Sequence, residues 1–274
     1  MMPDEESDRY EAAWRRIDTT VAHPARRYNY WLGGKDHFAA DRESGDAVLA
    51  AFPTARIAAL ENRAFMGRAV RYLVREAGIR QFLDIGTGIP APNNTHEVAQ
   101  EIAPETRVVY VDNDPIVMSH ARALFTSASP GATSYIEADL RDYPSILDHP
   151  DLTATIDPSQ PVGLLLVAIL HFLPDGEDPY KTVRGLVSAL PSGSYLVASH
   201  ATTDHTPPAV QAQIIGAMKH GSVYARPGVE FARFFDGLEL VEPGVVSIAD
   251  WRPDSPDHLT PAQAGACGAV GRKP

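Results

Sequence analysis

The chain has 274 residues, with 24 Lys and Arg against 35 Asp and Glu, and it contains one cysteine. The net charge of −11 disfavours a general binder of nucleic acids, whose phosphates an acidic surface repels. The single cysteine, Cys267, excludes an intrachain disulfide and a zinc site built from several thiolates, and it favours a cytoplasmic location.

The sequence shows no sign of export or of a membrane span. Residues 1–8 are acidic, whereas a secretory signal begins with basic residues and continues into an apolar run. The longest apolar stretch, Val162–Leu170, is far shorter than the ~20 residues that cross a bilayer, and it is typical of a buried strand. We therefore expect no export signal and no membrane association.

The N-terminal part of the chain has a helical pattern. Residues 41–52 have helical spacing, and Thr54 can cap a long helix that ends at Gly78. This part is nearly neutral in charge, so the excess acid lies in the rest of the chain. We predict an N-terminal helical cap over residues 1–78 and a second domain over residues 79–274.

The second part alternates short apolar runs with helical stretches. This alternation predicts parallel strands joined by right-handed crossovers, an α/β fold with a doubly wound, Rossmann-like sheet. Two of the helices begin with Asp114-Pro115 and Asp178-Pro179, an aspartate cap followed by proline at the first helical position. Three late strands with little helix between them indicate an antiparallel hairpin at the sheet edge. The predicted strands are residues 81–85, 107–111, 134–138, 162–169, 194–199, 238–241, 245–248 and 267–271.

Asp84, Gly86, Thr87 and Gly88 form a tight turn after the first strand, where backbone can approach a ligand closely. Many strand-to-helix turns contain two glycines, so the turn alone is weak evidence. Asp84 adds to it, because a carboxylate at this position binds an ammonium group and repels a pyrophosphate. The third glycine of the dinucleotide fingerprint is absent, with Ala91 in its place. The turn predicts a ligand with an ammonium group and no phosphate, which disfavours an NAD-dependent dehydrogenase.

Acidic residues also follow the second and third strands. Asp112 lies near the sequence distance from the first glycine at which an acid meets ribose hydroxyls in nucleotide-binding α/β folds. Asn113 can lie against an adenine, and Asp139, followed by Leu140, can accept from the adenine amino group. Each acid taken singly could equally be a helix cap or a solvated turn. Ribose together with ammonium points to S-adenosylmethionine as the cofactor.

Three strand-end segments, residues 82–88, 111–113 and 138–140, resemble those of the class I S-adenosylmethionine-dependent methyltransferases. Further segments resemble the actinobacterial S-adenosyl methyltransferase family, long catalogued as a domain of unknown function. They are residues 26–36, 61–65, 94–97, 109–115 and 232–235. The resemblance implies a seven-stranded methyltransferase sheet with an N-terminal helical cap. It does not identify the methyl acceptor.

The segment 29–36 contains Gly-Gly-Lys without the spacing of a phosphate-binding loop, so we reject nucleoside triphosphate binding. One interpretation of this segment is an aromatic-rich turn that anchors the cap. The interpretation we favour is a lid in which Tyr28, Tyr30 and Trp31 close over the cofactor. Arg63 would then pair with the methionine carboxylate of the cofactor.

His171 and His200 are the candidate catalytic residues. They follow the fourth and fifth strands, at the edge where an acceptor would lie, and either could act as a general base. The alternative for each is a packed or surface histidine. The other histidines form no pair or triad with metal-ligand spacing, and the fourth strand ends without a carboxylate cluster, so we predict no metal.

Residues 168–172, after the fourth strand, also bear on the acceptor. Enzymes that methylate amino groups of nucleic-acid bases carry an Asp/Asn-Pro-Pro-aromatic motif there, and this chain does not. Together with the acidic second part, this favours a small-molecule acceptor methylated on oxygen or nitrogen. Residues 213–218 and 224–235 are candidates either for its pocket or for the core. A non-catalytic S-adenosylmethionine-binding protein stays open as an alternative.

Overall fold

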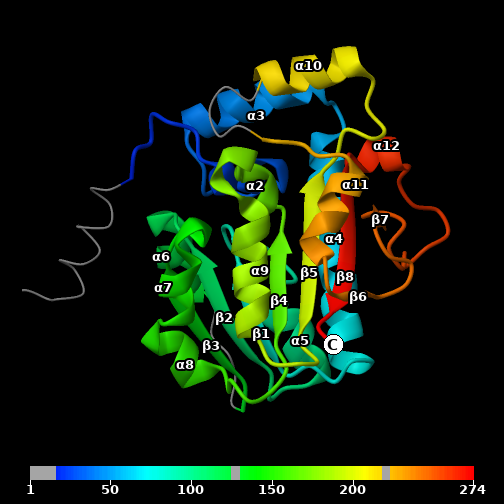
Figure 1. Cartoon of the computed structure of the whole chain (residues 1–274). Coiled ribbons are helices and arrows are strands. Elements are labelled where there is room, and N and C mark those ends of the chain that lie inside the picture. Colours follow the sequence, from blue (N-terminus) through cyan, green and yellow to red (C-terminus); the bar gives the residue numbers. More distant parts are fainter. Residues whose placement is uncertain (1–16, 125–129, 218–222) are drawn as a thin grey trace, which may run out of the picture.

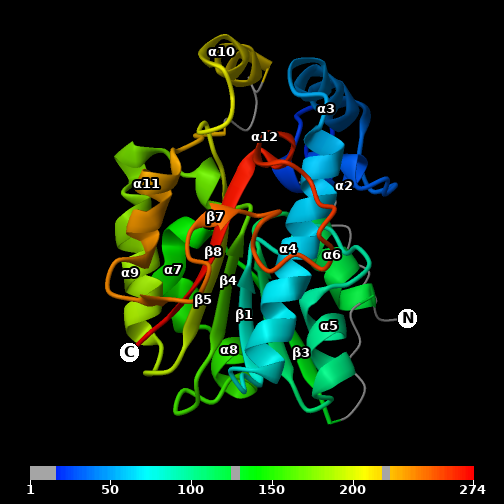
Figure 2. The same ribbon diagram turned by 90° about the vertical axis from the view of Figure 1, so that its right-hand side faces the viewer.

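A central sheet carries helices on both faces, and further helices cross its upper end (Figure 1). The structure, a computed structural model, describes residues 17–124, 130–217 and 223–274. Its helices are α2 (Pro24–Trp31), α3 (Ala39–Ala51), α4 (Ala55–Arg75), α5 (Thr95–Ile102), α6 (Pro115–Leu124), α7 (Tyr143–Leu147), α8 (Pro150–Thr155), α9 (Pro179–Ala189), α10 (Pro208–Ala217), α11 (Gly228–Phe231) and α12 (Pro261–Ala264). Figure 2 shows α4 and α5 on one face of the sheet and α7 and α9 on the other.

The predicted doubly wound α/β class is confirmed. The strands are β1 (Gln81–Ile85), β2 (Arg107–Asp112), β3 (Ala132–Glu137), β4 (Gly163–Val167), β5 (Tyr195–Ala201), β6 (Glu239–Leu240), β7 (Val246–Ser247) and β8 (Ala266–Arg272). Five strands pair in parallel in the order β3-β2-β1-β4-β5. The order changes direction between β1 and β4, which is the point where ligands bind in such sheets.

The far edge of the sheet is antiparallel, as predicted, and it has one strand more than the seven that the family resemblance implied. The sheet has eight strands rather than seven, and β8 lies antiparallel to β5. The strands β6 and β7 do not pair with each other, because each has only two residues and both pair with the longer β8. A Cβ on Gly268 of β8 would lie 2.8 Å from the ring of Phe65, so the small residue lets α4 pack closely on this strand.

Helix α4 joins the cap to the sheet. Phe65 and Leu73 of α4 are fully buried against Phe82 and its neighbours on one face, and Val183 of α9 is buried on the other. Full burial of such a side chain contributes about 1.5–3 kcal/mol. The division into residues 1–78 and 79–274 stays a prediction, because the helix before the proposed boundary shares its core with the sheet.

Asp41 holds the first two cap helices together. Its buried carboxylate accepts from the His23 N–H at the start of α2 and from the Phe38 N–H at the start of α3, both at 2.8 Å. Pro24 occupies the first position of α2. The sequence prediction took the region after Tyr28 as a turn or lid, because the cap for α2 comes from a residue far along the chain. Helix α10, also not predicted, packs along α3 (Figures 1 and 2).

Some predictions fall outside the described residues. These are the acidic residues 1–8 and Met218, the last residue of the candidate segment 213–218. In the part of the chain that the structure does describe, no helix has the length and apolar character needed to cross a bilayer.

Candidate functional site

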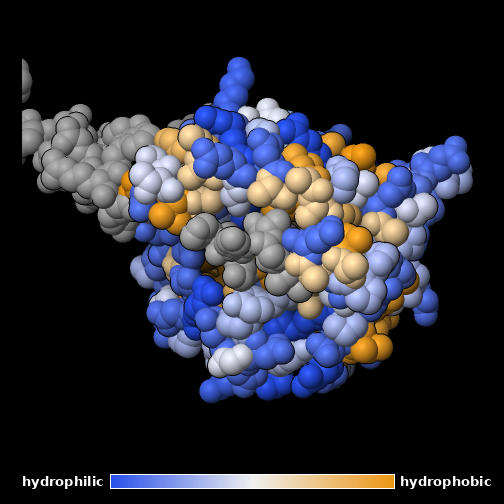
Figure 3. All heavy atoms as spheres, turned by 90° about the horizontal axis from the view of Figure 1, so that it is seen from above, coloured by the Kyte–Doolittle hydropathy of each residue, from blue (hydrophilic) through white to orange (hydrophobic). Residues whose placement is uncertain are grey.

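A cavity of about 570 Å³ lies over the carboxyl ends of the parallel strands. Helices α2, α3 and α4 contribute side chains to it from the cap, and α10 contributes Gln211. Figure 3 looks down on this end of the molecule, where apolar and polar side chains are mixed. All the predicted site residues except Tyr30 line the cavity, namely Arg63, Asp84, Gly86, Thr87, Gly88, Asp112, Asn113, Asp139, Leu140, His171 and His200.

The turn after β1, residues 84–88, requires glycine both for its backbone conformation and because a side chain would collide with a neighbour. We call it the glycine turn. Gly86 and Gly88 have φ angles of 79° and 70°, in the left-handed region that side chains disfavour. A Cβ on Gly86 would lie 2.3 Å from the Ile169 side chain. The Gly86 N–H donates to Val111 O at 2.8 Å, and the Thr87 hydroxyl donates to Asp84 O at 3.0 Å. The turn is therefore fixed between β1, β2 and the segment after β4.

Asp84 is a buried carboxyl at the end of β1. Its Oδ2 accepts from the Thr95 hydroxyl at 2.6 Å. Burial raises the pKa of Asp84 to about 6, although the Thr95 hydrogen bond and the charge of Arg63 favour the ionised form. A cationic ligand next to Asp84 would relieve this cost, which fits the predicted ammonium site.

Asp112, at the end of β2, is also buried and tied to the glycine turn. Its Oδ2 accepts from the Gly88 N–H at 2.8 Å, and its Oδ1 accepts from the Asp114 N–H at 3.0 Å. Burial raises the pKa of Asp112. The carboxylate oxygens keep lone pairs for further donors, as ribose hydroxyls would be.

Asn113 and Asp139 meet across the ends of β2 and β3. The Asn113 side-chain amide donates to Asp139 Oδ2 at 2.8 Å, and the Arg141 N–H donates to Asp139 Oδ1 at 2.8 Å. Burial raises the pKa of Asp139, but these hydrogen bonds and the Arg141 charge outweigh it and hold the pKa below its ordinary value. Leu140 is buried beside them in the core.

Arg63 of α4 binds the loop that precedes α5. Its Nη2 donates to Pro92 O at 2.9 Å and to Asn93 O at 3.1 Å. Arg63 also lines the cavity, and its charge acts on Asp84. The pairing of Arg63 with the cofactor carboxylate stays a prediction. In the structure, Arg63 also holds this loop against α4.

The aromatic residues of α2 divide between the cavity and the outer surface of the cap. Tyr28 and Trp31 line the cavity, whereas Tyr30 does not. The Tyr30 hydroxyl donates to Asp46 Oδ1 at 2.7 Å, and the Arg56 guanidinium lies 4.8 Å from its ring centre. The segment is a helix, so residues 28 and 31 share one face while residue 30 points elsewhere. The predicted contact of Tyr30 with the cofactor does not fit this placement.

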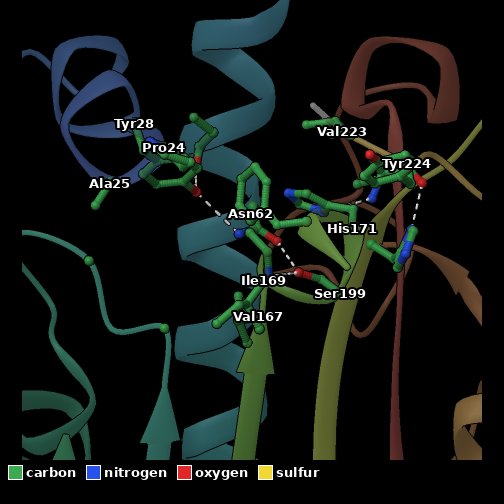
Figure 4. Close-up of a pocket in the computed structure, with 18 of the residues that line it drawn as sticks. Pro24, Ala25, Tyr28, Asn62, Val167, Ile169, His171, Ser199, Val223 and Tyr224 are labelled. Atoms are coloured by element: carbon green, nitrogen blue, oxygen red, sulfur yellow. Dashed lines mark hydrogen bonds between the residues drawn. The ribbon is translucent and has the colours of Figure 1, made fainter. Parts of the chain in front are cut away.

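A hydrogen-bonded pair in the cavity was missed from the sequence. The Ser199 hydroxyl accepts from the Ala168 N–H at 2.9 Å and donates to Asn62 Oδ1 at 2.6 Å, and Asn62 Nδ2 donates to the Tyr28 hydroxyl at 3.1 Å (Figure 4). Ala168 has a φ of 56°, a costly conformation for a residue with a side chain. Strained backbone and buried polar side chains thus meet at the end of β4. The sequence indicated this pair only through Asn62, which lies in segment 61–65, one of those that resemble the methyltransferase family.

His171 follows β4, and its ring is turned toward the Asn62 side of the cavity (Figure 4). Its Nδ1 accepts from the Ala201 N–H at 3.3 Å. Burial, the neighbouring His200, and the charges of Arg27 and Arg226 lower the pKa of His171 well below its ordinary value. The ring is therefore neutral with its proton on Nε2, which makes it a hydrogen-bond donor toward the cavity. This geometry disfavours the predicted role as a general base.

His200, at the end of β5, uses both ring nitrogens within the protein. Its Nδ1 donates to Ala201 O at 2.7 Å, and its Nε2 accepts from Arg226 Nη1 at 2.9 Å. Arg226 in turn pairs with Asp175 at 2.6 Å. Burial lowers the pKa of His200 to about 4. His200 thus has no ring lone pair available to an acceptor, and the arrangement supports a positioning role rather than the predicted catalytic one.

Within residues 17–124, 130–217 and 223–274, no three or more His, Cys, Asp or Glu side chains are grouped so that they could hold a metal ion.

Comparison with known proteins gives two close matches. The sequence profile of a family described as S-adenosyl methyltransferase matches residues 10–274. The chain is 47% identical to a DUF574 family protein from Streptomyces avermitilis, with a TM-score of 0.91 over 94% of this chain and 100% of that one. It is 43% identical to a proposed methyltransferase from Thermobifida fusca, with a TM-score of 0.85 over 93% and 96% of the two chains.

A more distant match concerns the fold. The mitomycin 7-O-methyltransferase MmcR is 15% identical, with a TM-score of 0.52 over 94% of this chain and 74% of that one. At this identity the match shows the fold alone, which is the Rossmann-like class I methyltransferase fold. No curated protein matches this sequence closely enough to be counted as a relative.

Proposed function

Because this chain belongs to the S-adenosyl methyltransferase family, and is therefore an S-adenosylmethionine-dependent methyltransferase, we propose that it methylates an oxygen or nitrogen atom of a small molecule. Family membership sets aside the NAD-dependent dehydrogenase and the non-catalytic binding protein as alternatives. Beyond family membership, the proposal concerns the class of methyl acceptor.

The residues over β1, β2 and β3 fit the cofactor. Asp84 is a buried carboxyl whose raised pKa makes a cationic partner favourable, so we assign it to the ammonium group. Asp112 would accept from the ribose hydroxyls, and Asn113 and Asp139 would lie at the adenine. The glycine turn gives backbone access to the same space.

The size and lining of the cavity carry the proposal of a small acceptor. The walls over β4 and β5 come from the strand ends, and the roof comes from α2, α3 and α10, including Trp31, Val48 and Gln211. Cap helices cover part of the strand ends, so the space is a partly covered cleft. Its volume of about 570 Å³ lies in the usual range of small-molecule sites.

Methyl transfer mainly requires that the acceptor and the methyl donor be positioned correctly. S-adenosylmethionine supplies a methyl group on a positively charged sulfur, and the leaving thioether needs no protonation. The protein then has to hold the acceptor in line with that methyl group and exclude water, which orientation alone can do. We call the half of the cavity over β4 and β5 the acceptor half, because the methyl acceptor would bind there. Asn62, Ser199 and His171 lie in this half, with their polar groups fixed by hydrogen bonds.

The proposal is tested by a methyl-transfer assay. Purified protein is incubated with methyl-labelled S-adenosylmethionine and a panel of hydroxyl, carboxyl and amino compounds, and products are identified by mass spectrometry. Asp84→Asn should weaken cofactor binding, measured by calorimetry, and lower the rate of transfer together with it. Transfer to macromolecules alone, with no product from any small molecule, would contradict the proposal.

A further inference from the structure

The carboxylates that line the cavity gather over one half of the sheet. Among the described residues that line it, the carboxylates belong to Asp84, Asp112, Asp139 and Glu177. The first three follow β1, β2 and β3, and Glu177 pairs with Arg141 beside Asp139 at 2.6 Å. The cofactor half, over β1, β2 and β3, therefore holds all four carboxylates, together with Arg63 and Arg141. Within the described lining, the acceptor half over β4 and β5 has no carboxylate.

Arg27 of α2 brings a positive charge to the acceptor half. It lines the cavity although only 2% of the residue is exposed. Its Nη1 donates to the Ser44 hydroxyl at 3.0 Å, and its guanidinium lies 5.6 Å from the Trp31 ring centre. Burial outweighs the attraction of Asp41 and lowers the pKa of Arg27 to about 10, so the group is still a cation at neutral pH. Arg27 also acts on the charge of His171, which places its guanidinium near the acceptor half, where an anion would be attracted to it.

The described side chains of the acceptor half supply no base. The Tyr28 hydroxyl donates to Ala59 O at 2.8 Å, and the Ser199 hydroxyl donates to Asn62 Oδ1. His171 presents Nε2–H, and His200 has both nitrogens engaged. An acceptor that had to lose a proton would find no proton acceptor among these described side chains. An acceptor that arrives already ionised needs none.

We propose that the methyl acceptor is an organic carboxylate with an apolar body, and that Arg27 binds its negative charge; this rests on the proposed function. The apolar body lies against Trp31, Val48 and Phe52, which line the same half. A carboxylate oxygen forms the bond to the methyl carbon, the carbon–sulfur bond breaks, and its electron pair neutralises the sulfur. The products are a methyl ester and S-adenosylhomocysteine, and no proton moves. Neutralising two opposite charges is favoured in a cavity of low dielectric constant.

The experiment is a calorimetric titration of the protein saturated with S-adenosylhomocysteine. The probes are matched pairs that differ in charge: benzoate and benzamide, 2-naphthoate and 2-naphthamide, indole-3-acetate and indole-3-acetamide. In the wild type, at least one carboxylate should bind and do so at least about 10-fold tighter than its amide, a difference of about 1.4 kcal/mol. Arg27→Met should abolish this preference. Arg56→Gln, which removes a cation on the outer side of the cap, should keep it.

Several results would overturn the inference. They are equal affinities within every pair, a preference that survives Arg27→Met, and no binding of any carboxylate. If Arg27→Met does not fold, Arg27→Lys replaces it in the test. The lysine ammonium lacks the planar pair of N–H donors of arginine, so this variant should reduce the preference for the carboxylate over its amide. With methyl-labelled donor, the product from the preferred carboxylate should release labelled methanol in alkali, and a stable N-methyl product would also overturn it. A wild type that fails to bind S-adenosylhomocysteine would instead contradict the proposed function.

Discussion

The Ser199 hydroxyl donates to the Asn62 amide oxygen at 2.6 Å, joining β5 to α4 across 137 positions of sequence. Both residues are buried and both line the cavity. The bond fixes the amide so that its nitrogen faces Tyr28. The acceptor half of the cavity is thereby held between the sheet and the cap.

This pair should contribute measurably to stability. Ser199→Ala leaves the Ala168 N–H and the Asn62 amide oxygen without their partner, which costs about 1–3 kcal/mol in the free energy of unfolding. A double-mutant cycle with Asn62→Ala, measured by urea unfolding, should give a coupling energy of about 1 kcal/mol. Strictly additive effects would show that the two side chains do not interact.

Asp84→Asn should stabilise the ligand-free protein at neutral pH. Because burial raises the folded-state pKa of Asp84 to about 6, the fold loses stability as the pH rises from 4 through 6. The neutral amide avoids this loss, for a gain of up to about 3 kcal/mol at pH 7.5. Urea unfolding at pH 4 and pH 7.5 measures it, with the exposed Asp254→Asn as control. A variant less stable than wild type at pH 7.5 would contradict the assigned cause.

The same substitution should have the opposite effect on cofactor binding. Loss of the Asp84 carboxylate should weaken the affinity for S-adenosylmethionine by about 10- to 100-fold. In the wild type the affinity should rise between pH 5 and pH 7 as Asp84 ionises, whereas the variant should show no such rise. Calorimetric titrations across this range decide the matter, and a parallel pH dependence in both proteins would exclude Asp84 as the ammonium site.

Gly86→Ala should disrupt the turn that follows β1. The substitution forces a left-handed φ on alanine and places its Cβ against Ile169, for a loss of about 1–3 kcal/mol in the free energy of unfolding. Cofactor affinity should fall with it. Gly176→Ala is the matched control, since a Cβ there meets nothing within 4 Å. Thermal melts and titrations compare the two, and equal behaviour would refute the steric account.

His200 should make the protein sensitive to acid. Burial lowers its folded-state pKa from 6.5 to about 4, so the unfolded chain takes up the proton first as the pH falls below 6.5. This group should cost about 2 kcal/mol of the free energy of unfolding between pH 7 and pH 5. His200→Gln keeps an acceptor for Arg226 and should lose correspondingly less stability over that range. An unchanged loss in urea unfolding would show that His200 does not set the acid sensitivity.

The cofactor half of the site was predictable because parallel strands end at one edge of the sheet. Asp84, Asp112 and Asp139 each follow a strand, so recognising the strands was enough to bring them together. The choice between Tyr28 and Tyr30 needed the helical state of α2, whose cap comes from Asp41.

The acceptor half was less accessible to prediction because its side chains meet over long sequence distances. Nothing near Asn62 indicates that Ser199 will be its partner, and the engagement of both His200 nitrogens depends on Arg226. The antiparallel edge was predicted, but the partners of β6 and β7 were not, since these two-residue strands are too short to carry a pattern and both pair with β8.

Helix α4 extends from the cavity into the core of the sheet. Asn62 and Met66 line the cavity, while Phe65 and Leu73 of the same helix are fully buried. Lifting this helix would expose side chains whose burial is worth about 1.5–3 kcal/mol each. Helices α3 and α10 instead cross the end of the molecule together. Because Val48 is the one buried apolar side chain of α3, opening the cavity at this helix would expose far less of the core than lifting α4.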